Sequence, residues 1–382
     1  QSVIELFFVY LTIFSFVIFI YYDCAAPRFF LSRFNFFINF FYPTLYVTDP
    51  ENIQHVLQSD VHSFNHRGLA VCDSDVLGIN ILLLHGAKWR LVRQKLTPLF
   101  TAAKLKNMYY IIDKSAQDFV DFVKKNPEKL KKDTYSYNTL THFCNAAISA
   151  AVFGIGTEST FESPFQKMAK IAIKPGFWTN IKFSMASTSD RLFKVMRLKI
   201  FGNYKKFLIS AIKKVIRKRE QENTMKYDFP EMCAFFFFIA GVEPTAAMMS
   251  AVMLELGRNP DIQDRVCKEM NEIIQKYNGQ LAYDAIFEME YFGRALDESL
   301  RMHPPVGFLT RQCVQKSVLP VGNISVEKNT KIFTPIFDVH HDPKYYPDPG
   351  VFYPDRFVRG RSTNDPVFMA FGKGHRKCFG AR

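Results

Sequence analysis

The sequence lacks the cysteine patterns of a disulfide-rich or zinc-binding protein. Its seven cysteines are odd in number, scattered along the chain and never spaced as Cys-x-x-Cys. Such a set excludes a disulfide framework and favours a reducing compartment, where one or two thiols at most take part in chemistry. Internal repeats, low-complexity tracts and Gly/Ser-rich linkers are also absent from the sequence, so composition does not divide the chain into small domains.

Charged residues are few, at 22%, and hydrophobic residues are many, at 48%, which excludes wholesale disorder in a chain of 382 residues. Aromatic residues reach 15%, with 40 Phe, so a core or pocket should be lined largely by rings. Acidic residues are outnumbered, because 36 Asp and Glu face 49 Lys and Arg and leave a net charge of +13. This excess favours an anionic partner.

Part of the basic excess is local. Residues 191–219 contain eleven Lys and Arg and no acid, interleaved with hydrophobic residues. Two interpretations stay open for this stretch, a solvated pair of amphipathic helices and a contact with anionic lipid. Nucleic acid is not an expected partner, because no RNA-binding motif or helix-turn-helix pattern accompanies the charge.

A hydrophobic run stands near the start of the chain. Residues 6–22 contain no charge, and the run approaches the ~20 residues that a helix needs to cross a bilayer. We therefore expect a membrane anchor at residues 1–22 and a folded domain at residues 23–382. A cleaved signal peptide is the alternative, because Ala25 and Ala26 follow the run, although no basic region precedes it.

The charges that flank this run predict its orientation. Glu5 precedes the run, whereas Arg28 and Arg33 follow it. The positive-inside bias therefore places the rest of the chain on the cytosolic side. The sequence begins with Gln1 instead of Met, which suggests a fragment of a longer protein.

Hydrophobic periodicity and turn residues predict a mainly α fold with a small β part late in the chain. The expected elements are a strand, turn and helix in 43–66, helices through most of 86–220, a long helix in 230–259, a helix in 282–302 and short strands in 317–336. The long helix should begin at Pro230, which stands in the favoured first-turn position, and should be closed by Asn259-Pro260. The strands should turn at Gly322-Asn323 and Lys328-Asn329. One large mixed domain is the expected organisation.

The last residues carry the densest motif of the chain. Residues 371–380 read Phe-Gly-Lys-Gly-His-Arg-Lys-Cys-Phe-Gly, which places Cys378 among cations and backbone amides that stabilise a thiolate. The glycines would let the backbone approach a large flat ligand. A plain loop and a zinc site using His375 and Cys378 are the alternatives, but zinc needs about four ligands and no partner pair is near.

The pattern F-x-x-G-x-R-x-C-x-G resembles the haem-thiolate loop of the cytochromes P450. Further stretches resemble that family in the family's own order, from about Leu45 to the end of the chain. They are Trp89–Arg93 for W-x-x-x-R, Ala240–Glu243 for the oxygen-binding helix, Glu298–Arg301 for E-x-x-R and Tyr353–Phe357 for P-E-R-F. The chain is most similar to the insect microsomal type.

The resemblance implies a P450 fold behind a transmembrane helix, with haem b held through an axial cysteine thiolate. Cys378 matches the ligand of the haem iron. The positions whose side chains bind the haem propionates are matched by Trp89, Arg93, Arg311 and Arg376, and the planar fork of Arg suits that task. Eight residues match cofactor-binding positions: Trp89, Arg93, Ala240, Gly241, Arg311, Phe371, Arg376 and Cys378. Glu298, Arg301 and Arg356 match a structural ion network that anchors the cysteine loop.

The resemblance also implies a haem-thiolate monooxygenase, because the thiolate favours cleavage of the O–O bond. Its substrates would be lipophilic xenobiotics or endogenous compounds, with electrons from NADPH through cytochrome P450 reductase and with cytochrome b5 as a further partner. Lys373, Arg376 and Lys377 could attract the acidic electron donor. The expected location is the endoplasmic reticulum membrane, with the catalytic domain on the cytosolic face. The alternatives are a reductase-independent isomerase or dehydratase and a non-catalytic, truncated haem-binding membrane protein.

The predicted catalytic residues are Glu243 and Thr245 in the long helix. The family delivers protons through an acid followed by an alcohol, but here Pro244 occupies the place of the alcohol and Thr245 comes one residue later. Proline removes the hydrogen bond to the carbonyl of Ala240 and is expected to kink the helix. One residue is about 100° around a helix, so Thr245 need not point at the iron.

Three segments are shorter than the family pattern. The sequence stops at Arg382, before the helix and β-hairpin that follow the cysteine in the family, and residues 28–43 read as a shortened hinge and first helix. A stretch that normally precedes the long helix is missing between Lys226 and Pro230. We therefore expect a partial or degenerate P450 chain.

Overall fold

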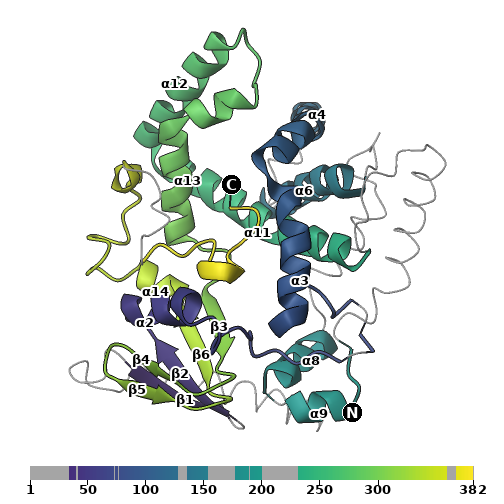
Figure 1. Ribbon diagram of the computed structural model, residues 1–382. Coiled ribbons are helices and arrows are strands. Elements are labelled where there is room, and N and C mark those ends of the chain that lie inside the picture. The colour runs from purple at the N-terminus through teal and green to yellow at the C-terminus, as the bar shows by residue number, and fades with distance from the viewer. Residues whose placement is uncertain are drawn as a thin grey trace, which may run out of the picture.

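The computed structural model describes residues 34–39, 42–72, 74–75, 77–127, 136–153, 177–188, 190–199, 231–358 and 367–381. Helices dominate this part of the chain, and the strands form two small sheets that lie to the lower left in Figure 1. The predicted fold class, mainly α with a small β part, is confirmed.

A four-stranded sheet joins the two halves of the sequence. Its strand order is β1-β2-β6-β3, where β1 is Phe34–Asn39, β2 is Tyr42–Val47, β3 is Phe308–Gln312 and β6 is Lys331–Pro335. The pairs β1/β2 and β3/β6 are antiparallel, whereas β2 and β6 are parallel. The sheet therefore brings the N-terminal segment against the region that leads to the cysteine loop.

The first strand of this sheet was not expected from the sequence, which we read as a shortened hinge and helix in residues 28–43. The six residues of β1 are Phe, Asn and Ile, and aromatic and β-branched side chains favour strands. Their partner β2 follows after a short connection, so pairing along the whole of β1 is local. This local pairing favours a strand over the expected helix at Phe34–Asn39.

The second sheet is the hairpin of β4 (Ser317–Leu319) and β5 (Ile324–Val326). Gly322, Asn323 and Asn329 all have positive φ, at 86°, 50° and 74°. Glycine and asparagine adopt this backbone region most easily, which is why the chain turns at these points. The predicted strands and both predicted turns in 317–336 are confirmed.

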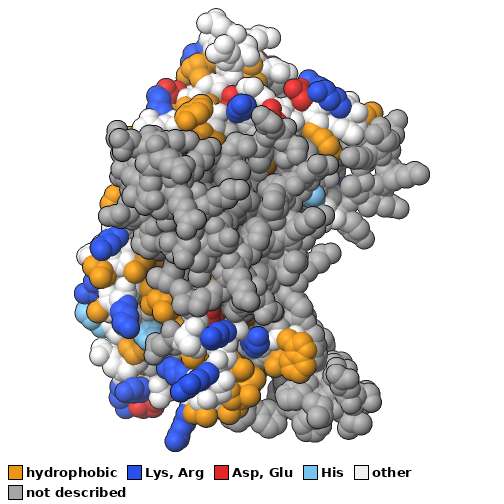
Figure 2. Space-filling view, turned by 90° about the vertical axis from the view of Figure 1, so that its right-hand side faces the viewer, with side chains coloured by type: hydrophobic (Ala, Val, Ile, Leu, Met, Phe, Trp, Pro, Cys, Tyr) orange, Lys and Arg blue, Asp and Glu red, His pale blue; other side chains and the backbone are white. Residues whose placement is uncertain are grey.

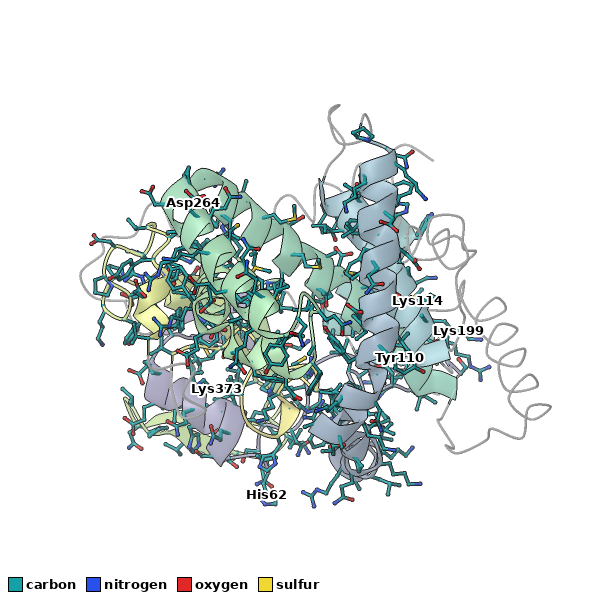
Figure 3. All side chains as sticks on the ribbon, turned by 90° about the horizontal axis from the view of Figure 1, so that it is seen from above. His62, Tyr110, Lys114, Lys199, Asp264 and Lys373 are labelled. Carbon is teal, nitrogen blue, oxygen red and sulfur yellow. The ribbon has the colours of Figure 1, made fainter. Side chains whose placement is uncertain are left out.

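Helices form the upper and right-hand parts of the view in Figure 1. The long helices are α3 (Gly86–Leu96), α4 (Ala102–Lys125), α6 (Ser136–Phe153), α8 (Phe177–Thr188), α11 (Glu231–Arg258), α12 (Pro260–Lys276) and α13 (Glu290–Met302). The short ones are α2 (Pro50–Gln54), α9 (Asp190–Val195) and α14 (Ile336–His340). Seen from above, α12 with Asp264 and α4 with Tyr110 and Lys114 lie on opposite sides of the molecule (Figure 3).

The long helix α11 packs against α6, and α6 in turn packs against α4. Gly241 allows the close approach, because a Cβ atom there would come within 2.7 Å of the Ile148 side chain on α6. Helix α11 covers Glu231–Arg258, which confirms a long helix in the predicted range 230–259, and it continues through Pro244.

The helix predicted at 282–302 is two elements in the structure. A 3-10 turn covers Asp284–Glu288, and α13 begins at Glu290. The carboxylate of Glu269 on α12 accepts hydrogen bonds from the backbone N–H groups of Tyr291 and Phe292, at 2.8 and 2.9 Å. This cap from a neighbouring helix satisfies the free donors of the first turn and places the start of α13 there.

Within the described ranges, no helix combines the length and the apolar character that a bilayer span requires. The anchor that we predict at residues 1–22 lies outside these ranges. Most of the basic stretch 191–219 does so as well, and only its residues up to 199 are described. There, Leu192, Val195 and Met196 are exposed beside basic residues. Figure 2 shows hydrophobic and basic side chains interleaved on the lower part of its face, where α8 and α9 lie.

Candidate haem-binding site

The loop that carries Cys378 folds back on itself through short backbone hydrogen bonds. A 3-10 turn forms at Gly374–Arg376, and the N–H of Cys378 donates to the carbonyl of Phe371 at 2.8 Å. Gly372 and Gly374 have φ values of 70° and 64°, a region that favours glycine. The folded loop leaves Cys378 exposed among the described residues, so its thiol can reach a bound metal.

Gly374 is required by packing as well as by its backbone angle. A Cβ atom on Gly374 would lie 2.2 Å from the carbonyl oxygen of Leu57 and 2.9 Å from the Cα of Gln58. Both residues belong to a π-helical turn at His55–Ser59 that follows α2. The cysteine loop therefore rests directly on the backbone of that turn.

Four arginines gather around the cysteine loop. Arg93 comes from α3, Arg311 from β3, Arg376 from the loop itself and Arg67 from the segment that precedes α3. Arg311 and Arg376 are only 3% and 8% exposed. No carboxylate pairs with any of the four within the described part of the chain, so the cluster is a concentration of positive charge, of which Arg311 and Arg376 are buried and Arg67 and Arg93 partly buried.

The electrostatics of this cluster follow from burial and mutual repulsion. Burial and the neighbouring arginines lower the pKa of Arg376 to about 8, and burial and Arg67 lower that of Arg311 to about 9. Burial and Arg93 lower the pKa of Arg67 to about 10, against which Cys378 acts in the raising direction. Each guanidinium would therefore be stabilised by an anion placed among them.

Aromatic rings and carbonyl groups hold two of these arginines in place. Arg93 donates to the carbonyl of Lys377 at 2.9 Å and lies over the ring of Phe379. Arg376 lies over Trp89, 4.4 Å from the ring centre, and donates to the carbonyl of Leu84 at 2.7 Å. Trp89 thus orients an arginine, which is a second task beside any contact of its own with a ligand.

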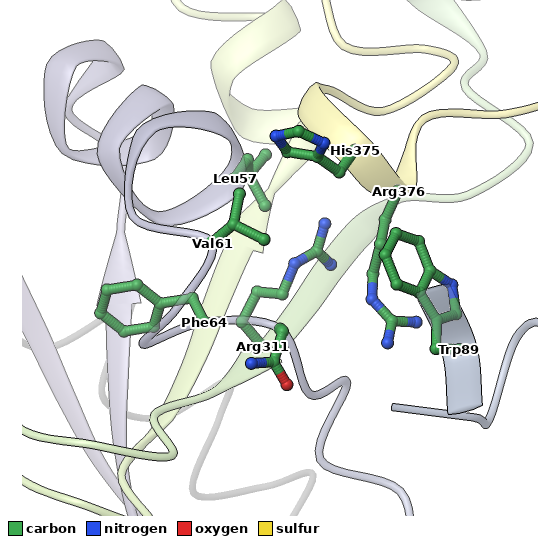
Figure 4. Close-up of a pocket in the computed structure, with 8 residues that line it drawn as sticks. Leu57, Val61, Phe64, Trp89, Arg311, His375 and Arg376 are labelled. Carbon is green, nitrogen blue, oxygen red and sulfur yellow. The ribbon is translucent and has the colours of Figure 1, made fainter. Parts of the chain in front are cut away.

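Several donors of the cluster have no partner. Arg67 Nε, Arg376 Nε and Arg376 Nη1 are buried and have no hydrogen-bond partner among the described residues. Figure 4 shows Arg311 and Arg376 entering one small pocket beside Trp89 and His375. Unsatisfied cationic donors beside an exposed thiol fit a ligand that carries carboxylates and a thiolate-binding metal, and haem is such a ligand.

On α11 the predicted catalytic residues point in different directions. The hydroxyl of Tyr137 on α6 donates to Glu243 Oε1, while Glu243 Oε2 is buried and has no partner in the part of the chain that the structure describes. Burial and the carboxylate of Glu243 raise the pKa of Tyr137. Ala240 and Thr245 are exposed, so the structure places Glu243 against α6 and does not bring it together with the Thr245 hydroxyl.

The expected ion network is present, and its Glu298–Arg301 pair is fully buried, while Arg356 is partly exposed. Arg301 donates to both oxygens of Glu298 at 2.8 Å, and Arg356 Nε donates to Glu298 Oε1 at 3.2 Å. The backbone N–H of Tyr353 also donates to Glu298 Oε1, at 3.1 Å. Glu298 and Arg301 have no exposed surface, so the network links α13 to the segment that leads to the cysteine loop.

The loop cations are less accessible than the sequence suggested. Lys373 and Arg376 are each 8% exposed, and only Lys377 of the three is exposed. On the neighbouring helix α3, Lys88, Arg90 and Lys95 are exposed.

Comparison with known proteins agrees with this geometry. The family described as Cytochrome P450 matches residues 34–230 and 205–382 of the chain. The chain belongs to the cytochrome P450 family. It is therefore a monooxygenase, and the family implies a haem cofactor bound by a cysteine thiolate.

Several insect P450s are similar to this chain. Cytochrome P450 6B5 of Papilio glaucus is 30% identical over 372 residues, which cover 89% of this chain and 78% of the relative. Cytochrome P450 6B2 of Helicoverpa armigera is 29% identical over 89% of this chain and 73% of the relative. Probable cytochrome P450 6a20 of Drosophila melanogaster is 28% identical over 91% of this chain and 75% of the relative. These relatives bear out the insect P450 resemblance.

Arg67 is the site residue that sequence reasoning missed. No surrounding motif distinguishes it from a solvated surface arginine, and the isolated β-bridge between His66 and Gln312 brings it beside Arg311. The sequence offers one signal, the glycine that follows Arg67, because glycine often marks a tight turn. In the structure Gly68 has a φ of 76°, and its N–H donates to His66 Nδ1 at 2.8 Å.

Proposed function

We propose that this P450 binds haem b through Cys378 and oxidises lipophilic xenobiotics or endogenous apolar compounds. The observation that carries the proposal is an exposed thiol beside four arginines that have no anionic partner within the described ranges. Cys378 would ligate the iron, while Arg67, Arg93, Arg311 and Arg376 would bind the propionates. When bound, a thiolate-ligated haem activates molecular oxygen so that one atom enters the substrate and the other leaves as water.

The protein must also supply protons, and α11 offers the carboxyl group of Glu243 and the hydroxyl group of Thr245 for this task. Glu243 Oε2 has no hydrogen-bond partner among the residues that the structure describes and is the atom at which a proton would be held. Pro244 has no N–H, so the carbonyl of Ala240 lacks its helical donor and remains an acceptor for a water molecule or for a substrate hydroxyl. The exposed hydroxyl of Thr245 would take the part of the alcohol that Pro244 replaces.

The electron donors that we propose are NADPH–cytochrome P450 reductase and cytochrome b5. Exposed Lys88, Arg90 and Lys95 on α3, together with exposed Lys377 on the loop, support an acidic partner. Arg93 ties the two elements together through the carbonyl of Lys377. Opposite charges on such surfaces mainly accelerate association, so binding should weaken as salt is added.

We further propose that the protein resides in the endoplasmic reticulum membrane, with its catalytic domain on the cytosolic face. The uncharged run at residues 6–22 and the arginines that follow it support this location. Exposed Leu192, Val195 and Met196 beside basic residues would suit a contact with the anionic membrane surface.

The deciding experiment is a carbon monoxide difference spectrum of the reduced protein. Wild-type protein should give the thiolate-ligated haem signature, and Cys378→Ser should abolish it. Cys267→Ser is the matched control, because Cys267 is also an exposed free thiol. An unchanged spectrum in Cys378→Ser would contradict the assignment.

A turnover assay with added reductase then tests the reaction class. A monooxygenase consumes NADPH and oxygen as product forms from a lipophilic substrate. Turnover of a peroxide or dehydration of a substrate without NADPH would instead support the reductase-independent alternative.

A further inference from the structure

His340 is a buried histidine that lies outside the site described above. It is the last residue of α14 and has no exposed surface. Its Nδ1 lies 3.2 Å from the carbonyl oxygen of Arg301, and its Nε2 lies 2.9 Å from the backbone nitrogen of Met369. The ring thus spans from α13 to the segment that enters the cysteine loop.

These two partners determine the tautomer of the ring. A backbone N–H can only donate, so Nε2 accepts the hydrogen bond from Met369 and carries no proton. Nδ1 then carries the proton and donates it to the carbonyl of Arg301, which can only accept. Burial and the nearby charges of Arg301, His341 and Lys373 lower the pKa of His340 to about 3, which is consistent with this neutral form.

The His340 ring is held by a stacking contact, and its backbone is held by Arg301. The ring stacks on Phe368 with an interplanar angle of 1° and a centroid distance of 5.3 Å. In the reverse direction, Arg301 Nη1 donates to the backbone carbonyl of His340 at 2.9 Å. His340 and Arg301 therefore bind each other reciprocally, and Arg301 is itself held by Glu298.

The contact to Met369 continues into the loop. The carbonyl of Met369 accepts a hydrogen bond from the N–H of Gly372 at 2.8 Å, which closes the turn where φ is positive. The carbonyl of the adjacent Phe371 accepts the N–H of Cys378, also at 2.8 Å. Hydrogen bonds at Met369 and Phe371, joined by the short backbone segment between these residues, therefore link the ring of His340 to the backbone of Cys378.

We propose that His340 is a positioning residue that holds the entry to the cysteine loop at a defined distance from the ion network of α13, and so sets the position of Cys378. Its effect on thiolate ligation rests on the proposed haem function, whereas its effect on the loop backbone does not. The ring acts through two hydrogen bonds and makes no contact with a ligand.

The test compares three variants by amide hydrogen exchange of the peptide that covers residues 367–372, and by the thiolate-ligated fraction of the reduced carbon monoxide complex. His340→Leu keeps an apolar side chain but removes both hydrogen bonds. His340→Gln keeps one donor and one acceptor. His341→Leu is the matched control, because His341 is the next residue and, among the described residues, the hydrogen bond of its ring is to the carbonyl of Phe337 within the same short helix.

We expect His340→Leu to accelerate amide exchange in residues 367–372 by about tenfold, because this segment loses its buried hydrogen bond from Met369 to the ring. The thiolate-ligated fraction should fall as well. His340→Gln should remain within about threefold of wild type, since it retains both hydrogen-bonding functions. His341→Leu should change neither measurement. If His340→Leu does not fold, His340→Gln alone decides.

Two results would overturn the proposal. One is a His340→Leu protein that exchanges and ligates like His341→Leu. The other is a folded His340→Gln protein whose 367–372 segment exchanges about tenfold faster than wild type, which would leave His340 a packing role only. Failure of the haem assignment itself would appear as an unchanged spectrum in Cys378→Ser, and the exchange result would remain interpretable.

Discussion

Arg67 illustrates how one residue can complete a site without any sequence motif. It adds a fourth positive charge to the arginine cluster, and its Nε is buried without a partner. Nearby Arg93 and burial both disfavour its charged form, whereas a propionate would favour it. An anionic ligand explains the position of Arg67 better than packing does.

Replacing Arg67 by Ala should therefore weaken haem retention. A charge-assisted hydrogen bond contributes about 1.5–3 kcal/mol, so we expect haem to dissociate about 10–100 times faster from Arg67→Ala. Haem transfer to an apo-protein acceptor, followed by absorbance, measures this rate. Arg90→Ala removes the same charge from an exposed position and should dissociate at the wild-type rate. Equal rates in both variants would remove Arg67 from the site.

Gly374 and Gly372 provide a second comparison at the residue scale. Both have positive φ, which costs a non-glycine residue about 1–2 kcal/mol. Of these two glycines, only Gly374 would also clash with the backbone, because its Cβ would lie 2.2 Å from the Leu57 carbonyl oxygen, whereas the nearest atom to a Cβ at Gly372 is at 3.8 Å.

We therefore expect Gly372→Ala to lower stability modestly and still bind haem. Gly374→Ala should displace the loop from the π-helical turn and yield little haem-loaded protein. Haem content per folded protein, from absorbance and circular dichroism, compares the two variants. Similar haem loading in both would show that the turn at residues 55–59 moves aside easily.

At the scale of the element, α11 departs from its family pattern at one position. Pro244 leaves the carbonyl of Ala240 without a helical donor, and Glu243 binds Tyr137 on α6. The acid and the hydroxyl of Thr245 lie two residues apart, about 200° around the helix. Their separation explains why the structure does not form a direct acid–alcohol pair here.

Pro244→Thr should restore the hydroxyl to the expected position and raise the product formed per NADPH several-fold, with less hydrogen peroxide released. Thr245→Ala should lower that ratio if its hydroxyl substitutes for the missing alcohol. Because proline inside a helix costs about 3 kcal/mol, Pro244→Thr should also be more stable, and coupling must be compared at equal folded, haem-loaded concentration. Identical coupling in all three proteins would exclude a role for either hydroxyl.

For the whole molecule, two buried histidines predict its response to acid. Burial lowers the pKa of His340 and of His66 to about 3, from an ordinary value of 6.5. His66 faces His85, Arg376, Lys194 and Lys331, which disfavour its protonation further. Between pH 6.5 and 3 the unfolded chain therefore binds protons that the folded protein does not.

Acid should therefore lower the stability of the folded protein. The stability that these neutral histidines contribute is complete above pH 6.5 and is lost as the pH falls toward 3. Each histidine should account for about 2 kcal/mol of the loss in unfolding free energy between pH 7 and pH 5. Urea unfolding at several pH values should show a shallower slope for His340→Gln. His62→Gln, at an exposed position, should keep the wild-type slope. A steep slope retained in His340→Gln would contradict the assignment.

Several features of this protein were determined by its sequence alone. The cysteine loop, the E-x-x-R pair and the long helix after Pro230 depend on residues that are close together in the chain. Spacing of three on a helix places Glu298 and Arg301 on one face, and glycines at 372 and 374 allow the turns that the loop needs. Local chemistry was sufficient for these, and the structure agrees with each of them.

Only the tertiary structure decided the remaining features, because each depends on partners far apart in the sequence. Glu269 on another helix determines where α13 begins, and the sheet pairs β2 with β6 although almost three hundred residues separate them. The burial of Lys373 and the contact of Glu243 with Tyr137 likewise follow from packing. Arg67 joins the site for the same reason, since a lone arginine becomes a ligand-binding group only when folding removes it from water and places other cations beside it.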